Sequence, residues 1–223
     1  MANIINHQIK QVNLTFIPEE SGFDFSSVDT TRLKLKISEI FSDSKISTTQ
    51  LPDMLIIFDP NNQINITIWE SQNRIIVAFS KLTPYTSFSL ENLLKLSAEV
   101  ITIIGINSKI KAYGLNVISS FDLESIDDSG VLIKDNFISE EIVKKIDGEL
   151  KSAGVNFVFE KESCRYNLKL EPRFSGLELN TTNSVDANLN AHFKGNPPAS
   201  ADFLAKLQLT YDTFGTNLIK IFS

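Results

Sequence analysis

The sequence predicts an α+β protein built from two similar repeats, each running strand, helix, meander and long helix. We expect long helices to pack on a face of one antiparallel sheet or of two abutting sheets. Two observations predict this class. Short segments that alternate apolar and polar residues between turn residues are typical of half-buried strands. Two longer segments, 87–104 and 201–222, repeat apolar residues at steps of three and four, as amphipathic helices do.

The two repeats are expected at residues 1–107 and 108–223, joined in one compact pseudo-duplicated unit. This division depends on the order of the elements, because the two halves share little residue identity. Each half has roughly the size of a small domain.

The first half opens with a predicted strand at 8–17, in which alternate residues are apolar. Residues 28–41 fit both an alternating strand and a helix, and Asp29 as an N-cap favours the helix. Three strands, at 54–58, 64–68 and 74–79, are separated by polar turns and predict an antiparallel meander.

The helix at 87–104 is the most strongly apolar segment of the chain. Its predicted buried face carries the residues Leu90, Leu93, Leu94, Ala98, Ile101 and Ile104. We expect Leu94 and Ile101, seven residues apart, to be almost fully buried.

The second half opens with a predicted strand at 110–121 and a polar stretch at 122–136. Ser139 then caps a helix that ends near Gly154. Three or four strands follow, at 155–160, 164–170, 177–181 and 186–193. The last helix has one apolar face, which carries Phe203, Leu207, Tyr211, Phe214 and Leu218.

Composition indicates a soluble globular protein. The chain of 223 residues is 42% hydrophobic and 22% charged, which suffices for a buried core. A net charge of -6 disfavours extensive contact with nucleic acid, because phosphate binding needs a concentrated basic surface. Cys164 is the one cysteine, so an intrachain disulfide is excluded. Without a signal peptide or an apolar run long enough to span a bilayer, the sequence predicts a cytoplasmic protein that does not enter membranes.

One segment suggests a family. Residues 79–88 read Phe-Ser-Lys-Leu-Thr-Pro-Tyr-Thr-Ser-Phe, and the strand after the middle helix carries Gly114-Leu115 and Ile118. This pattern resembles a sporadically distributed bacterial protein family of unknown function, whose members share both motifs around a middle helix. The resemblance covers about fifty residues and implies a bacterial protein of similar architecture. Asn116 stands where that family tends to have arginine, and Ser119 where it tends to have asparagine.

The sequence offers few groups for catalysis. His7 and His192 stand apart from other ligand types, and no spacing predicts a metal site. Cys164 could act as a nucleophile if His192 met it in space, but a buried structural thiol is the simpler interpretation. The acidic stretch 122–128 lacks the ligand order of a calcium loop, and no glycine-rich phosphate loop occurs. We therefore predict no catalytic, metal or cofactor-binding residue, and favour a protein that is not an enzyme.

Two functions are compatible with these observations. The favoured one is a non-catalytic binding or regulatory module that engages a macromolecular partner, most simply a protein, through the outer face of a sheet or its loops. The polar stretch 180–190, rich in Asn, Thr and Ser, supports it. The alternative is a small-molecule binder or enzyme with a pocket between sheet and helix, for which Arg165, Tyr166 and Arg173 would be the polar groups.

Lys81 and Tyr85 are the candidate partner-binding residues. They lie in a loop beside Pro84, between a strand and the middle helix, and binding groups concentrate in loops held by rigid elements. Tyr85 could instead staple the entry of the helix, and Trp69 could serve either recognition or the core. The sequence leaves both alternatives and the oligomeric state open.

Overall fold

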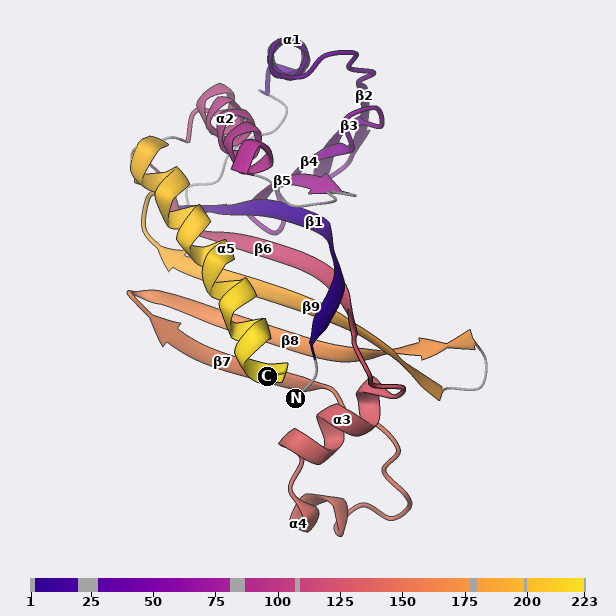
Figure 1. Ribbon diagram of the computed structural model, residues 1–223. Helices are drawn as coiled ribbons and strands as arrows, with labels where there is room; N and C mark the ends of the chain where they lie inside the picture. The colour runs from indigo at the N-terminus through magenta and orange to yellow at the C-terminus, as the bar shows by residue number, and fades with distance from the viewer. Residues whose placement is uncertain are drawn as a thin grey trace.

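The structure, a computed structural model, describes residues 3–19, 28–80, 87–106, 109–176, 180–198 and 200–222. Its centre is a nine-stranded sheet with the order β2-β3-β4-β5-β1-β6-β9-β8-β7, in which neighbouring strands pair antiparallel (Figure 1). The strands are β1 (Ile4–Pro18), β2 (Ser47–Leu51), β3 (Met54–Asp59), β4 (Ile64–Trp69), β5 (Arg74–Ser80), β6 (Ile110–Leu123), β7 (Val155–Lys161), β8 (Cys164–Ser175) and β9 (Asn180–Lys194).

The long strands β1 and β6 hold the sheet together at its centre. They pair from Ile4 opposite Leu123 to Pro18 opposite Ile110, with register shifts near both ends. This pairing joins residues on both sides of the boundary predicted at 107/108. The chain therefore builds one continuous sheet from strands far apart in sequence.

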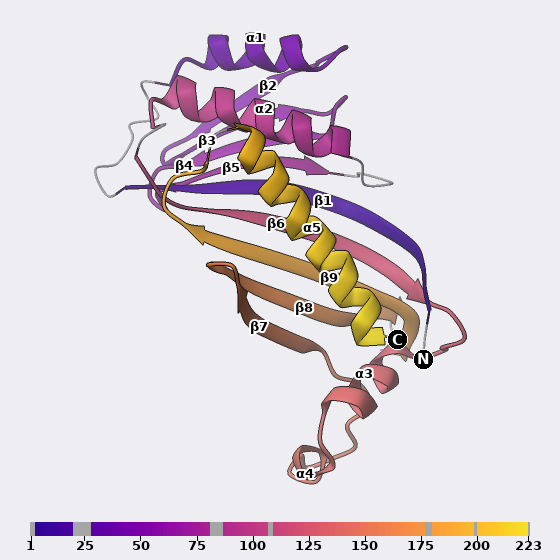
Figure 2. The same ribbon diagram turned by 60° about the vertical axis from the view of Figure 1, so that its left-hand side comes forward.

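The helices are α1 (Thr30–Ile40), α2 (Ser87–Ile104), α3 (Ser129–Phe137), α4 (Glu140–Val143) and α5 (Ser200–Phe222). Helix α5 crosses one face of the sheet diagonally, α2 lies beyond its N-terminal end, and α1 packs outside α2 (Figures 1 and 2). Helices α3 and α4 lie past the end of the sheet near the chain termini. No helix among the described residues is both long and apolar enough to cross a membrane.

The core lies between the sheet and helices α2 and α5, and buried residues of α1 join it. Successive residues of a strand point to opposite faces, so the apolar alternation of the central strands lines one face with buried side chains. These include Leu14, Phe16, Leu115, Val117, Leu168 and Leu189. The ring of Phe203 meets Tyr113 edge-on at 5.2 Å, and that of Phe222 meets Phe121 at 5.4 Å. Both ends of α5 are thereby fixed on β6.

The predicted class of two similar strand-helix-meander-helix repeats, with long helices packed on a face, is wrong. The sheet is single and continuous, and the described elements show no obvious repeat. One helix and four strands follow β1 before α2, whereas two short helices and three strands follow β6 before α5. Of the five described helices, α1 packs on another helix, and α3 and α4 lie beyond the sheet.

Several local predictions are confirmed and others corrected. Residues 30–40 form a helix, and the Asp29 side chain caps it by accepting a hydrogen bond from the Arg32 backbone N–H at 2.9 Å. The helix capped by Ser139 is only one turn long, 140–143, and does not extend to Gly154. Part of the polar stretch predicted at 122–136 is helix α3. The strand predicted at 186–193 belongs to the longer β9.

The buried face of α2 is rotated from the predicted one. Leu94 is 8% exposed, but Ile101 is only partly buried. The most buried residues of this helix instead include Leu93, Leu96 and Val100, at 1%, 0% and 0% exposure. Apolar residues surround this helix broadly, so periodicity alone could not show which arc meets the core.

Candidate binding surfaces

The predicted site residues that the structure describes, Arg165, Tyr166 and Arg173, do not gather in one pocket. Lys81 and Tyr85 lie outside the described residues. Arg165 and Tyr166 are neighbours on β8 and therefore point to opposite faces of the sheet. Arg165 is exposed and lies 3.8 Å from Glu160, whereas Arg173 lies 2.6 Å from Asp186.

Tyr166 belongs to the core. Its ring stacks on Phe159 with centroids 5.0 Å apart, and it is 3% exposed. Burial, followed by the neighbouring Cys164, raises the pKa of Tyr166 to about 12. This phenol is therefore a packed, neutral group at physiological pH.

Cys164 and His192 do not meet as a nucleophile and base. Cys164 is 1% exposed on the face toward α5, and its strand partner is Phe193 rather than His192. His192 points to the opposite face, opposite Arg165. Burial raises the pKa of the Cys164 thiol, which disfavours the reactive thiolate. The arrangement supports a structural thiol.

The face of the sheet opposite α5, here called the helix-free face, carries a row of asparagines. Asn13 on β1 pairs with Asn116 on β6, Asn116 with Asn190 on β9, and Asn190 with Asn167 on β8. These four residues, the asparagine row, lie side by side on adjacent strands. Asn13 lies on the helix-free face but is only 6% exposed.

A groove of about 300 Å³ lies along the middle of this face. Its lining includes Gln11, Asn13, Thr15, Arg74, Asn116, Asn190 and His192. Gly114 forms part of its floor between Thr15 and His192, its partners on β1 and β9. A Cβ added at Gly114 would lie 3.0 Å from the Ala191 carbonyl oxygen and 3.7 Å from Asn190 Oδ1. The missing side chain therefore permits the close approach of β9 and keeps the groove open.

Two amide oxygens of the helix-free face are buried without a hydrogen-bond partner among the described residues. They are Oδ1 of Asn116 and Oδ1 of Asn188, which lies two residues before Asn190 on β9. Asn13 Oδ1 accepts only a long bond, 3.4 Å, from the Thr15 hydroxyl among the hydrogen bonds of the described residues. A buried acceptor left unpaired costs about 1–3 kcal/mol. The fold thus carries polar groups on this face that its own contacts do not satisfy.

Charges flank the asparagine row. Asp186 Oδ1 lies 2.8 Å from Lys10 and 2.6 Å from Arg173. Burial alone would raise the pKa of Asp186, but its hydrogen bonds and charge interactions with Arg173 and Lys10 outweigh burial and lower it. Arg74, at the rim of the groove, has no carboxylate partner within ion-pair distance in the described part of the chain. Amide side chains are therefore the most frequent polar groups of the groove, and its lining also includes His192 and the cation of Arg74.

Comparison with protein families and with curated proteins finds no match. The resemblance to the bacterial family therefore remains a prediction. Asn116, one of the two positions at which that predicted resemblance breaks, lines the groove.

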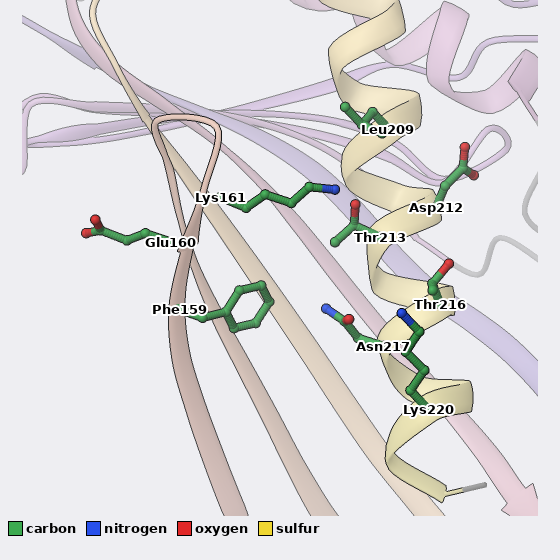
Figure 3. Close-up of a pocket in the computed structure, with 9 residues that line it drawn as sticks. All are labelled: Phe159, Glu160, Lys161, Leu209, Asp212, Thr213, Thr216, Asn217 and Lys220. Carbon is green, nitrogen blue, oxygen red and sulfur yellow. The ribbon is translucent and has the colours of Figure 1, made fainter.

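A second hollow, the β7–α5 groove, lies between the edge strand β7 and helix α5. Its volume is about 520 Å³, and its lining includes Phe159, Lys161, Asp212, Asn217 and Lys220. Lys161 points from β7 toward α5, whereas Glu160 points away from it (Figure 3). An adjoining hollow of about 520 Å³ shares Phe159, Asn217 and Lys220 and adds Phe137 and Phe157. Arg165, Tyr166 and Arg173 line neither hollow, although both lie between sheet and helix.

The two surfaces differ in the chemistry they can perform. The helix-free face presents amide donors and acceptors, which suit recognition by hydrogen bonds. The β7–α5 groove presents lysines beside Phe159, and the adjoining hollow adds further aromatic side chains; these groups suit anions and apolar groups. Within the described residues, no group of three or more His, Cys, Asp and Glu side chains is placed to hold a metal ion.

Proposed function

We propose that this chain is a non-catalytic binding module that engages a macromolecular partner, most simply a protein, through the helix-free face. The observation that carries the proposal is the asparagine row, with the partnerless amide oxygens of Asn116 and Asn188 beside it. Natural proteins rarely leave such groups unpaired without a reason. A partner that pairs with the asparagine row and turns these buried oxygens outward would supply the missing contacts.

The chemistry of the row favours a protein partner. Each amide side chain both donates and accepts hydrogen bonds, which matches the peptide groups and polar side chains of another protein. The net charge of -6 disfavours a phosphate-rich partner. We place the protein in the cytoplasm, and propose that Lys81 and Tyr85 contribute to partner binding.

Site-specific crosslinking tests the proposal. A photoreactive benzoylphenylalanine replaces exposed Asn190, and a matched control places it at exposed Ser38 on α1, away from the helix-free face. Both variants are expressed in the source organism and irradiated. We expect a defined crosslinked protein from position 190 that position 38 does not give. Equal products from both positions, or none from position 190, would contradict the proposed surface.

Substitution of the unpaired amides gives a second test, which separates binding from folding. Asn116→Val removes a buried oxygen without a partner and introduces a residue that favours strands. We expect unfolding free energy to stay the same or rise by about 1 kcal/mol, while crosslinking from position 190 falls. Chemical denaturation measures the first quantity. A loss of stability beyond about 1 kcal/mol would instead assign Asn116 a structural role.

A further inference from the structure

Strand β7 is an open edge of the sheet. It pairs with β8 at seven successive positions, from Val155 opposite Leu170 to Lys161 opposite Cys164, without a register shift. It occupies the end of the strand order, so its other side has no strand beside it among the described residues. The opposite edge, β2, is shorter and reads Ser-Thr-Thr-Gln-Leu. Only the β7 edge therefore combines regular geometry with large apolar side chains.

The hairpin between β7 and β8 fixes which backbone groups face outward. Glu162 and Ser163 form its turn with φ angles of 50° and 63°, as in a type I′ turn. Lys161 and Cys164 flank this turn, so Lys161 directs its backbone groups at β8. Alternation then directs the N–H and C=O groups of Asn156, Val158 and Glu160 to the free edge. Val158, the middle residue, has a side chain that is 55% exposed.

Two hollows lie beside this edge: the β7–α5 groove, whose lining is mainly polar and includes two lysines, and the adjoining hollow, whose lining is mainly apolar. Phe157 and Phe159 are partly buried on the side toward α5. Lys161 and Lys220 have no carboxylate within ion-pair distance in the described part of the chain, and Glu160 points away from the groove (Figure 3). Asp212 lines the upper part of the groove and accepts a hydrogen bond from Gln208 at 3.0 Å. The lining of the groove therefore holds Lys161 and Lys220 without an ion-pair partner among the described residues, while the carboxylates of Glu160 and Asp212 point away from them (Figure 3).

We propose that an extended segment of a partner polypeptide adds to the free edge of β7 as a further strand. Its backbone pairs with Asn156, Val158 and Glu160, and its alternate side chains point toward α5. Those side chains are large and apolar, to fill the hollow beside Phe157 and Phe159. One of them is a carboxylate that faces Lys161 and Lys220.

A second copy of the chain fits this edge less well. Antiparallel pairing of two β7 strands about Val158 would place Phe157 opposite Phe159 and Asn156 opposite Glu160. Glu160 would then lie on the face away from α5, so the partner's copy of β7 would bring no carboxylate to Lys161 or Lys220. The charges in the groove therefore favour a separate acidic segment. This site lies apart from the helix-free face, so the result of its test does not depend on the proposed function.

A displayed library of random dodecapeptides tests the proposal on the full chain. We expect the wild-type protein to enrich peptides that alternate apolar and polar residues and carry Asp or Glu. Val158→Pro removes an outward N–H but no bond to β8, and should abolish the enrichment. Val158→Thr, the matched control, keeps the N–H and should retain it. Loss of binding in both variants, or in neither, would overturn strand addition.

Two α5 variants keep the test valid if Val158→Pro fails to fold, which circular dichroism would show. Asn217→Trp fills the hollow shared by both parts of the groove, and Lys220→Glu reverses an exposed charge. Each variant should bind a synthetic copy of the enriched peptide with an affinity about tenfold or more below that of the wild type. Fluorescence anisotropy measures this affinity. Unchanged affinity in both would overturn the proposal. So would a wild-type dimer in sedimentation that Val158→Pro converts to a monomer, since the edge would then serve self-association.

Discussion

Alanine substitutions on α2 test which arc of this helix is buried. Leu96 is 0% exposed within the main core, whereas Leu94 is 8% exposed and borders a hollow of about 430 Å³ shared with Ile40 and Leu204. Removing a leucine side chain from a closed core costs about 3–5 kcal/mol, because transfer and cavity terms add. At Leu94 the neighbouring space is already open, so truncation leaves less new cavity and should cost about 2 kcal/mol.

Urea denaturation of Leu96→Ala and Leu94→Ala, followed by circular dichroism, measures both losses against the wild type. The two variants remove the same atoms from the same helix, so helix propensity cancels in the comparison. We expect Leu96→Ala to lose more stability than Leu94→Ala by about 1–3 kcal/mol. Equal losses, or a larger loss at Leu94, would show that α2 presents the opposite arc to the core.

Three further outcomes are expected. Burial raises the pKa values of Tyr113 and Tyr166 to about 12, above the ordinary value of 10.0. As the pH rises, the unfolded chain loses these protons before the folded chain does, so the free energy of unfolding should fall between about pH 10 and 12. Denaturation midpoints measured across this range should fall less in Tyr166→Phe than in the wild type. Asp29→Ala removes the N-cap of α1 and should lower the free energy of unfolding by about 1 kcal/mol. An unchanged midpoint of chemical denaturation would contradict the capping role of Asp29. Metal analysis of purified protein should find no stoichiometric zinc, since His192 and Cys164 face opposite sides of the sheet.

The sequence determined most of the local structure. Apolar periodicity located the central and final helices, and the polar side chain of Asp29 correctly favoured a helix at residues 30–40. Alternation also identified the three strands of the first meander. These features depend on neighbours within a few positions, and their energetics can therefore be read from short segments.

The tertiary structure decided which surfaces exist. Asn13, Asn116, Asn167 and Asn190 each occupy an outward position of a strand, and this alternation is visible in the sequence. Nothing local shows that these strands are adjacent, because antiparallel pairing joins segments separated by long stretches of chain. The repeat prediction was wrong for the same reason, since element order does not specify how strands assemble. Likewise, β7 became an edge only because the remaining strands paired on its other side.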